Sequence, residues 1–254
     1  MSQRDRRDFE RHWRDHNIPE ISLCKYAGAH EFLAPVFQKL RAGGEDWRIL
    51  DVGCGDGVHG VALEEGGGER RFGYWGIDFS VRAIRIAKQR LGARGRFNFL
   101  AGDALALPFP PKSFDAVFSY GVLAYTGAAE TALAEMARVC KPGGLIGIWM
   151  FPQKLGLGGK LFSLARFLCR MVGARLARWL IHLIVLFSPL LPLNSGVNLK
   201  NSSWRQCAEV LEVSLLPQTL DMFTLDEVLD WFRQLELSIQ VADEAKPVLV
   251  WAIR

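Results

Sequence analysis

The sequence predicts an α/β fold built on a seven-stranded, mostly parallel sheet that helices cover on both faces. Three observations support this prediction. Short apolar runs alternate with helix-type patterns between residues 47 and 150, as in chains with parallel sheets. Glycines or aspartates follow several of these runs, where parallel strands would end. Half of the 254 residues are hydrophobic, which is enough for a sizeable core and excludes a globally disordered chain.

The elements of this alternating part follow one another without a long gap. Two helices are expected before it, over residues 4–16 and 29–42, although Pro35 disfavours the second. Ser80 is the expected N-cap of a helix because its hydroxyl can accept a hydrogen bond from the first turn. The predicted strands are 47–52, 72–78, 96–103, 113–123 and 145–150, and the predicted helices between them are 57–65, 80–91 and 131–140.

The C-terminal part resumes the pattern after an interruption. Residues 223–235 are predicted to form a helix, because Thr224 and Glu227 have the spacing of a capping box. The apolar runs 237–243 and 246–254 are predicted to form an antiparallel hairpin.

We therefore expect four regions along the chain. They are N-terminal helices that form a lid (1–45), an α/β core (46–150), a helical insertion after the fifth strand (151–222), and a C-terminal helix and hairpin that complete the core sheet (223–254).

Composition excludes several classes of protein. The five cysteines form no CxxC pair, which argues against a disulfide framework and a zinc site and predicts a cytoplasmic protein. The net charge is only +4, and the sequence lacks the dense basic stripe of nucleic-acid binders, so no nucleic-acid partner is expected. His12 and His16 have metal-like spacing, but a solvated helix face is the preferred interpretation, and no metal is expected.

The strongest functional motif is the segment ILDVGCGDG, in which glycines follow the first predicted strand. Gly53 and Gly55 allow a sharp turn, and they let the backbone approach a ligand closely. Because a strand precedes this turn and a helix follows it, the segment predicts a nucleotide-binding loop.

Three aspartates end three successive predicted strands. Asp51 precedes the glycines, where a carboxylate repels a pyrophosphate but suits a cationic ligand or an amino group. Asp78 lies at the offset from the loop at which an acid meets ribose hydroxyls. Asp103 is suited to an adenine amino group, with Ala104 and Leu105 packed on the base. Because strand ends of a parallel sheet meet at one edge, we expect the three carboxylates around one cavity.

These residues carry a family resemblance. The segments ILDVGCGDG, GIDFS, AGDALALPFPPKSFDAVFSYGVLAYT and EMARVCKPGGLIGIWM resemble the successive motifs of Rossmann-like class I S-adenosylmethionine-dependent methyltransferases. The similarity is to the broad branch that includes the type 11 and the ubiquinone and menaquinone C-methyltransferases. It implies S-adenosyl-L-methionine as the cofactor.

The resemblance implies a role for each matching position. Asp51 and the backbone of Gly53, Cys54 and Gly55 would hold the methionine end, while Asp78 would bind the ribose. The adenine would meet Phe79, Asp103 and Ala104, and the sulfonium would be bordered by Ser119 and Tyr120.

The resemblance implies no fixed catalytic residue. Where many relatives have GVLHHT, this chain has GVLAYT, so Tyr125 and Tyr120 are the candidates if a base is needed. Their ordinary pKa of about 10 makes them poor bases at neutral pH, and we favour a hydrogen-bonding or shaping role for Tyr125. His59 either faces the ligand or, as we prefer, caps its helix. His30 and Tyr26 line the lid or simply pack.

The insertion contains a basic amphipathic pattern over residues 156–193. Its apolar run, 179–193, is too short to span a bilayer. Three interpretations stay open: a helical hood with solvated arginines, a hood that forms an apolar acceptor pocket, or a membrane-surface helix. Trp204, Glu212 and Asp221 are candidates for substrate contact, although packing and solvation are preferred. On a helical wheel the basic half holds Lys160, Arg166, Arg170, Arg175, Arg178 and His182, and the apolar half holds Leu161, Leu168, Val172, Leu176, Trp179 and Leu183.

The preferred function is a methyltransferase that acts on a small or lipid-like acceptor. Two alternatives stay open: a catalytically silent donor-binding or membrane-surface adaptor protein, and a nicotinamide oxidoreductase on the same scaffold. The predicted location is the cytoplasm; peripheral membrane contact through 156–193 is an alternative ranked after the hood with an acceptor pocket. The acceptor and the oligomeric state stay open.

Overall fold

The computed structural model describes the core of the chain and most of the predicted insertion helices. His12, His16, Tyr26 and Trp204 lie outside the described residues, so the predictions made for them have no structural counterpart. The described residues are 7, 10, 13, 28–42, 46–67, 72–151, 153, 156–186, 211–212, 214–217, 219–243 and 248–254.

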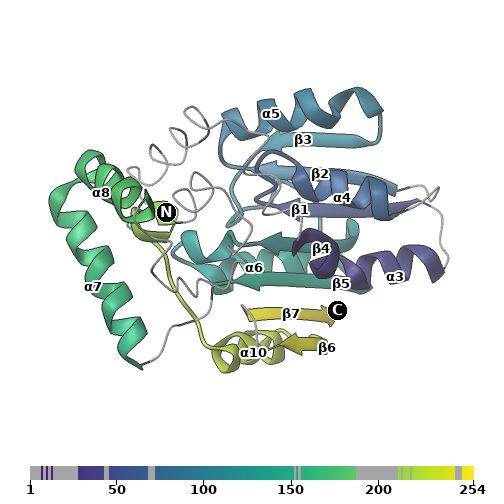
Figure 1. Ribbon diagram of the computed structural model, residues 1–254. Helices are drawn as coiled ribbons and strands as arrows, with labels where there is room; N and C mark the ends of the chain where they lie inside the picture. The colour runs from purple at the N-terminus through teal and green to yellow at the C-terminus, as the bar shows by residue number, and fades with distance from the viewer. Residues whose placement is uncertain are drawn as a thin grey trace.

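A seven-stranded mixed sheet forms the centre of the molecule (Figure 1). The strand order is β3-β2-β1-β4-β5-β7-β6, and β1 to β5 are parallel. β7 pairs antiparallel with both β5 and β6, so the predicted α/β class and the C-terminal hairpin are confirmed. The strands are β1 (Trp47–Val52), β2 (Phe72–Asp78), β3 (Phe97–Ala101), β4 (Phe114–Tyr120), β5 (Cys140–Met150), β6 (Ser238–Asp243) and β7 (Val248–Ile253).

Helices cover both faces of this sheet. α3, α4 and α5 contribute to one apolar cluster, and α6 and α10 contribute to the other. α7 and α8 project beyond one end of the sheet (Figure 1). The helices are α3 (Ala34–Ala42), α4 (Val58–Gly66), α5 (Val81–Leu91), α6 (Ala129–Val139), α7 (Gly156–Val172), α8 (Ala174–Leu186) and α10 (Leu225–Gln234), with short 3-10 turns η1 (Gly92–Arg94) and η2 (Leu123–Tyr125).

Predicted helix ends agree with local chemistry. Ser80 caps α5 by accepting from the backbone N–H of Ala83, and Thr224 and Glu227 form the expected capping box of α10. Pro35 lies in the first turn of α3, where the missing N–H has no helical partner to lose.

The fifth strand begins earlier than predicted. β5 starts at Cys140 instead of residue 145, because the PGG segment is a bulged part of the ladder and not a stop. Gly143 N–H donates to the carbonyl of Arg254, and the Arg254 N–H donates to the carbonyl of Gly144. These bonds continue the pairing of β5 beyond the last residue of β7.

The strand β7 contacts the helical turn at residues 28–32. Trp251 is fully buried, and its indole N–H donates to the carbonyl of Phe32 over 2.9 Å. Their rings lie 5.1 Å apart. A Cβ at Gly147 would overlap the Trp251 ring, so glycine on β5 makes room for this indole. β7 is therefore fixed both to the sheet and to the helical turn at residues 28–32.

Candidate functional site

The glycine turn after β1 is held against the end of β2. The N–H groups of Gly53 and Cys54 both donate to the carbonyl of Ile77, at 2.7 and 3.0 Å. Gly53 has a φ of 82°, and a Cβ there would overlap the Val122 side chain. A left-handed backbone and this close approach both require glycine. The sequence predicts that these N–H groups hold a ligand, whereas in the structure they hold the turn itself.

Asp51 is a buried carboxylate on the α4 side of β1. Its Oδ2 accepts a 2.6 Å hydrogen bond from the hydroxyl of Tyr74 and lies 3.3 Å from Nδ1 of His59. Among the described residues, Oδ1 has no hydrogen-bond partner. A buried carboxylate oxygen without a partner is costly, so this atom is suited to a donor such as an ammonium group. This fits the methionine end that the sequence assigns to Asp51.

Asp78 joins two loops at the carboxyl ends of β1 and β2. Its Oδ2 accepts from the N–H of Gly55 at 3.0 Å, and its Oδ1 accepts from the N–H of Ser80 at 2.9 Å. The residue is 8% exposed. A carboxylate oxygen can accept two hydrogen bonds, so this anchoring orients Asp78 and leaves it able to accept from neighbouring hydroxyls.

The carboxylates give the glycine turn a negative environment. Burial raises the pKa of the Cys54 thiol well above its ordinary value, and the charges of Asp51, Asp78 and Asp56 raise it further. The thiol is therefore neutral, which makes Cys54 a poor nucleophile. The same field favours a cationic ligand beside the turn.

Asp103 organises the loop that follows β3. Its Oδ1 accepts from the N–H of Leu105 at 3.0 Å, and Asp103 forms an isolated antiparallel β-bridge with Ala106. The adjoining part of the loop is fixed from α6: Glu135 accepts from the N–H of Leu107 at 2.8 Å, and Arg138 donates to the carbonyls of Leu107 and Phe109. Asp103 and Ala104 thus lie on a tethered loop at the same sheet edge as Asp78.

Replacement of Glu135 should weaken this tether in a pH-dependent way. The pKa of Glu135 is lowered, mainly by its hydrogen bonds with Arg138. Since the folded state favours the carboxylate, its contribution is complete above the unfolded pKa of about 4.3 and is lost as pH falls through the folded pKa. Glu135→Gln should cost about 1 kcal/mol at pH 7, because the pair is partly screened by solvent. Urea unfolding at pH 7 and near pH 3 measures this difference, which should shrink in acid; a constant difference would contradict the assignment.

Ser119 and Tyr120 end β4 beside the glycine turn. The Ser119 hydroxyl donates to the carbonyl of Val52 at 2.8 Å, so it fixes β4 to β1. The Tyr120 ring stacks on Trp149 with centroids 4.4 Å apart, and it lies 5.1 Å from the ring of His59. These aromatic rings form an apolar wall beside Asp51.

The two tyrosines considered as bases are buried. Burial, followed by the charge of Glu31, raises the pKa of Tyr120 to about 12. Burial raises the pKa of Tyr125 still further, although the nearby Arg166 opposes that shift. Both shifts disfavour a phenolate at neutral pH. A base role for either residue stays a prediction, and the shifts favour the alternative in which Tyr125 packs or donates a hydrogen bond.

Three contacts near the turn were missed in the sequence. Tyr74 and His59 both approach Asp51, and His59 neither caps α4 nor has a hydrogen-bond partner for its ring nitrogens among the described residues. A Cβ at Gly55 would lie 3.1 Å from the Trp13 ring, so Trp13 lies against the turn. A polar residue on a predicted buried strand, such as Tyr74, was the available signal for the first contact.

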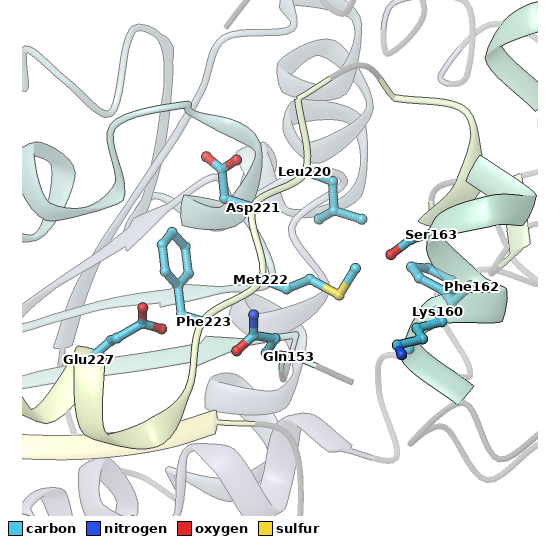
Figure 2. Close-up of a pocket in the computed structure, with 10 residues that line it drawn as sticks. Gln153, Lys160, Phe162, Ser163, Leu220, Asp221, Met222, Phe223 and Glu227 are labelled. Atoms are coloured by element: carbon cyan, nitrogen blue, oxygen red, sulfur yellow. The ribbon is translucent and has the colours of Figure 1, made fainter. Parts of the chain in front are cut away.

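A cavity of about 770 Å³ lies between α7 and residues 220–223 (Figure 2). Met222 and Leu220 point toward Phe162 and Ser163 of α7. Its other lining residues are Gln153, Gly159, Lys160, Asp221, Phe223 and Glu227. The lining thus combines an apolar part with hydrogen-bonding groups.

Backbone bonds place this cavity beside the sheet edge. The N–H of Asp221 donates to the carbonyl of Ala124, just after β4, and the N–H of Gln153, just after β5, donates to the carbonyl of Phe223. Tyr125 packs in the same small cluster as Leu220 and Phe151. The cavity therefore adjoins the edge that carries the aspartates.

The insertion helices differ from the wheel drawn from the sequence. Arg166, expected on a solvated face, is 6% exposed and donates to the carbonyls of Leu220 and Pro217 at 3.0 and 3.1 Å. Arg178 is also not simply solvated, because it pairs with Glu212. The interpretation in which the arginines are merely solvated is therefore wrong for these two. Glu212 packs against α8, whereas Asp221 lines the cavity.

Comparison with known proteins agrees with this geometry. Residues 49–144 match the family model described as "Methyltransferase domain". Residues 49–144 are thus similar to the domain of S-adenosylmethionine-dependent methyltransferases. S-adenosylmethionine is the cofactor of this family, and the orphan oxygen of Asp51 and the oriented carboxylate of Asp78 fit its cationic and hydroxyl groups.

Individual relatives also match part of the chain. The chain is 35% identical over 131 residues to a demethylmenaquinone methyltransferase of Bacillus licheniformis, which covers 51% of this chain and 56% of the relative. It is 29% identical over 129 residues to a sterol 24-C-methyltransferase of Pneumocystis carinii, covering 48% and 34%. The chain thus spans 34% and 56% of the length of these two relatives.

A solved structure supports the fold over a longer range. A SAM-dependent methyltransferase from Aquifex aeolicus superimposes with a TM-score of 0.51 at 15% identity, over 87% of this chain and 88% of that chain. The similarity shows a shared methyltransferase fold that extends beyond residues 49–144.

Proposed function

We propose that this protein transfers a methyl group from S-adenosylmethionine to a hydrophobic, small-molecule or lipid-like acceptor. The observation that carries the proposal is the cavity between α7 and residues 220–223, which adjoins the edge with Asp51 and Asp78. The relatives named for demethylmenaquinone and sterol support an apolar acceptor.

The proposed site needs little proton chemistry. S-adenosylmethionine supplies an electrophilic methyl group on a positively charged sulfur. Asp51 would bind an ammonium group through Oδ1, and Asp78 would accept from the ribose hydroxyls. Tyr120 and Trp149 would exclude water beside them. Methyl transfer is then accelerated mainly by positioning and by solvent exclusion, so high-pKa tyrosines are compatible with it.

The lining of the cavity suggests an amphipathic acceptor. Phe162, Leu220 and Met222 would contact an apolar body, while Lys160 and Asp221 would meet a polar head. We also propose a cytoplasmic location, which the free thiols of Cys54, Cys140 and Cys169 support. Contact of residues 156–193 with a membrane is a second, independent part of the proposal. In the described part of the chain, no helix is long and apolar enough to cross a bilayer.

Transfer of labelled methyl groups tests the proposed reaction. The protein is incubated with S-adenosylmethionine labelled in its methyl group and with a panel of acceptors: prenylated quinones, sterols and polar short-chain analogues. We expect the label to appear in the apolar extract only. Tight donor binding without transfer to any acceptor would favour the silent donor-binding protein instead.

A bulky side chain in the cavity should separate acceptor binding from donor binding. Ser163→Trp should raise the acceptor KM roughly tenfold or more, because an indole would occupy space that the acceptor needs. Donor affinity should not change. Leu164→Trp is the matched control, because Leu164 is the next residue on α7 and is 52% exposed outside the cavity lining. Equal KM values for both variants would place the acceptor elsewhere.

A further inference from the structure

The outer surface of α7 and α8 is apolar. Among the described residues, ten large hydrophobic side chains are exposed, and eight of them belong to these two helices. Their spacing of three and four residues puts them in one stripe on each helix. The eight, here named the outer stripe, are Leu164, Phe167, Leu168, Met171, Val172, Leu176, Trp179 and Leu180, with exposures from 38% to 72%.

The inner surface of the same helices packs against residues 215–220. Arg166 is bonded to the carbonyls of Leu220 and Pro217, and Ile181 packs with Leu215. Ala177 is fully buried. Rolling the helices to bury the outer stripe would break the bonds of a buried guanidinium, which is strongly unfavourable. The outer stripe is therefore a fixed property of the folded chain.

The charged side chains that the structure describes on α7 and α8 are all basic. The sequence contains no Asp or Glu between Glu135 and Glu209. Lys160 and Arg170 are exposed on α7. Glu212, the acid that packs against α8, is nearly buried and is paired with Arg178 and His182. An apolar stripe flanked by cations complements an anionic lipid surface.

We infer that the outer stripe docks this protein in the plane of an anionic lipid bilayer, with Phe167 and Trp179 inserted among the lipids. This inference specifies the membrane contact proposed above and does not depend on methyl transfer. The cavity at Ser163 and Met222 is lined by α7, the helix that also carries Phe167. An acceptor dissolved in the same bilayer would thus be close to the helix that lines its cavity.

Vesicle flotation tests the docking face. The intact protein should float with vesicles of mixed phosphatidylcholine and phosphatidylglycerol, and less with phosphatidylcholine alone. The double variant Phe167→Glu, Trp179→Glu should lose roughly tenfold or more of its vesicle affinity, because two inserted rings are replaced by charges that lipid excludes. Arg170→Gln should lower affinity several-fold for the anionic vesicles only, and added salt should do the same.

A control variant tests whether an exposed apolar residue outside the outer stripe also contributes to vesicle binding. Val241 is 41% exposed on the edge strand β6, so Val241→Glu introduces one such charge away from the outer stripe and should float normally. Calorimetry with S-adenosylhomocysteine shows whether each variant keeps its donor site, independently of vesicle binding. Absence of flotation by the intact protein, or unchanged flotation of the double variant, would overturn the inference. A lipid-free dimer that the same double variant dissociates would assign the face to a second copy instead.

Discussion

Asp78→Ala should abolish measurable donor binding at concentrations where the intact protein binds S-adenosylhomocysteine in the micromolar range. The carboxylate accepts from Gly55 and Ser80 and, in the proposed site, from the ribose. Charged hydrogen bonds contribute about 1.5–3 kcal/mol each, so losing those to the ribose should weaken binding about 100-fold or more. Isothermal calorimetry with S-adenosylhomocysteine and, separately, NAD measures this directly. NAD should give no heat.

Two further variants keep this test specific. Asp78→Asn retains an oxygen that can accept from Gly55, so it should fold and still bind weakly. Asp230→Ala is the control, because it removes a carboxylate that is 60% exposed on α10 and whose described contact is a salt bridge with Arg233. This variant should bind S-adenosylhomocysteine like the intact protein. Unchanged affinity in folded Asp78→Ala would reject the ribose assignment. NAD binding in place of S-adenosylhomocysteine would favour the oxidoreductase alternative.

Gly53→Ala should be among the most destabilising single-methyl changes in the chain. The φ of 82° is unfavourable for alanine by about 1–2 kcal/mol, and overlap with Val122 adds about 1–3 kcal/mol. The total of about 2–5 kcal/mol should appear in the free energy of unfolding measured in urea. Donor binding should fall as well, because the hydrogen bonds of this turn to Ile77 hold the end of β1 against the end of β2.

Gly95→Ala provides the matched comparison. Gly95 also has a positive φ, 59°, but a Cβ there would meet nothing within 4 Å. It should therefore cost only the backbone part, about 1–2 kcal/mol. If both variants lost equal stability, the close approach of Val122 would have no energetic role at Gly53.

The elements that the sequence predicted well are those specified locally. Alternation of apolar runs with helical patterns indicated all five parallel strands, and the Ser80 and Thr224 caps depend on residues only three positions apart. Glycines and aspartates at strand ends indicated the site because topology brings the carboxyl ends of parallel strands together.

The features that the sequence did not predict depend on partners far away in the chain. The bulged start of β5 depends on Arg254, and the environment of Asp51 depends on Tyr74 and His59. Helical periodicity separated an apolar from a basic face on α7, but periodicity does not say which face is inside. The burial of Arg166 follows from two carbonyls more than fifty residues along the chain.

The bond between the Trp251 indole and the carbonyl of Phe32 has a consequence for the order of folding. β7 inserts between β5 and β6, and it follows every other strand in the chain. During synthesis, the helical turn at 28–32 and the apolar edge of β5 stay uncovered until β7 has left the ribosome. Newly made chains should consequently depend on chaperones at that stage, however quickly their first three strands assemble.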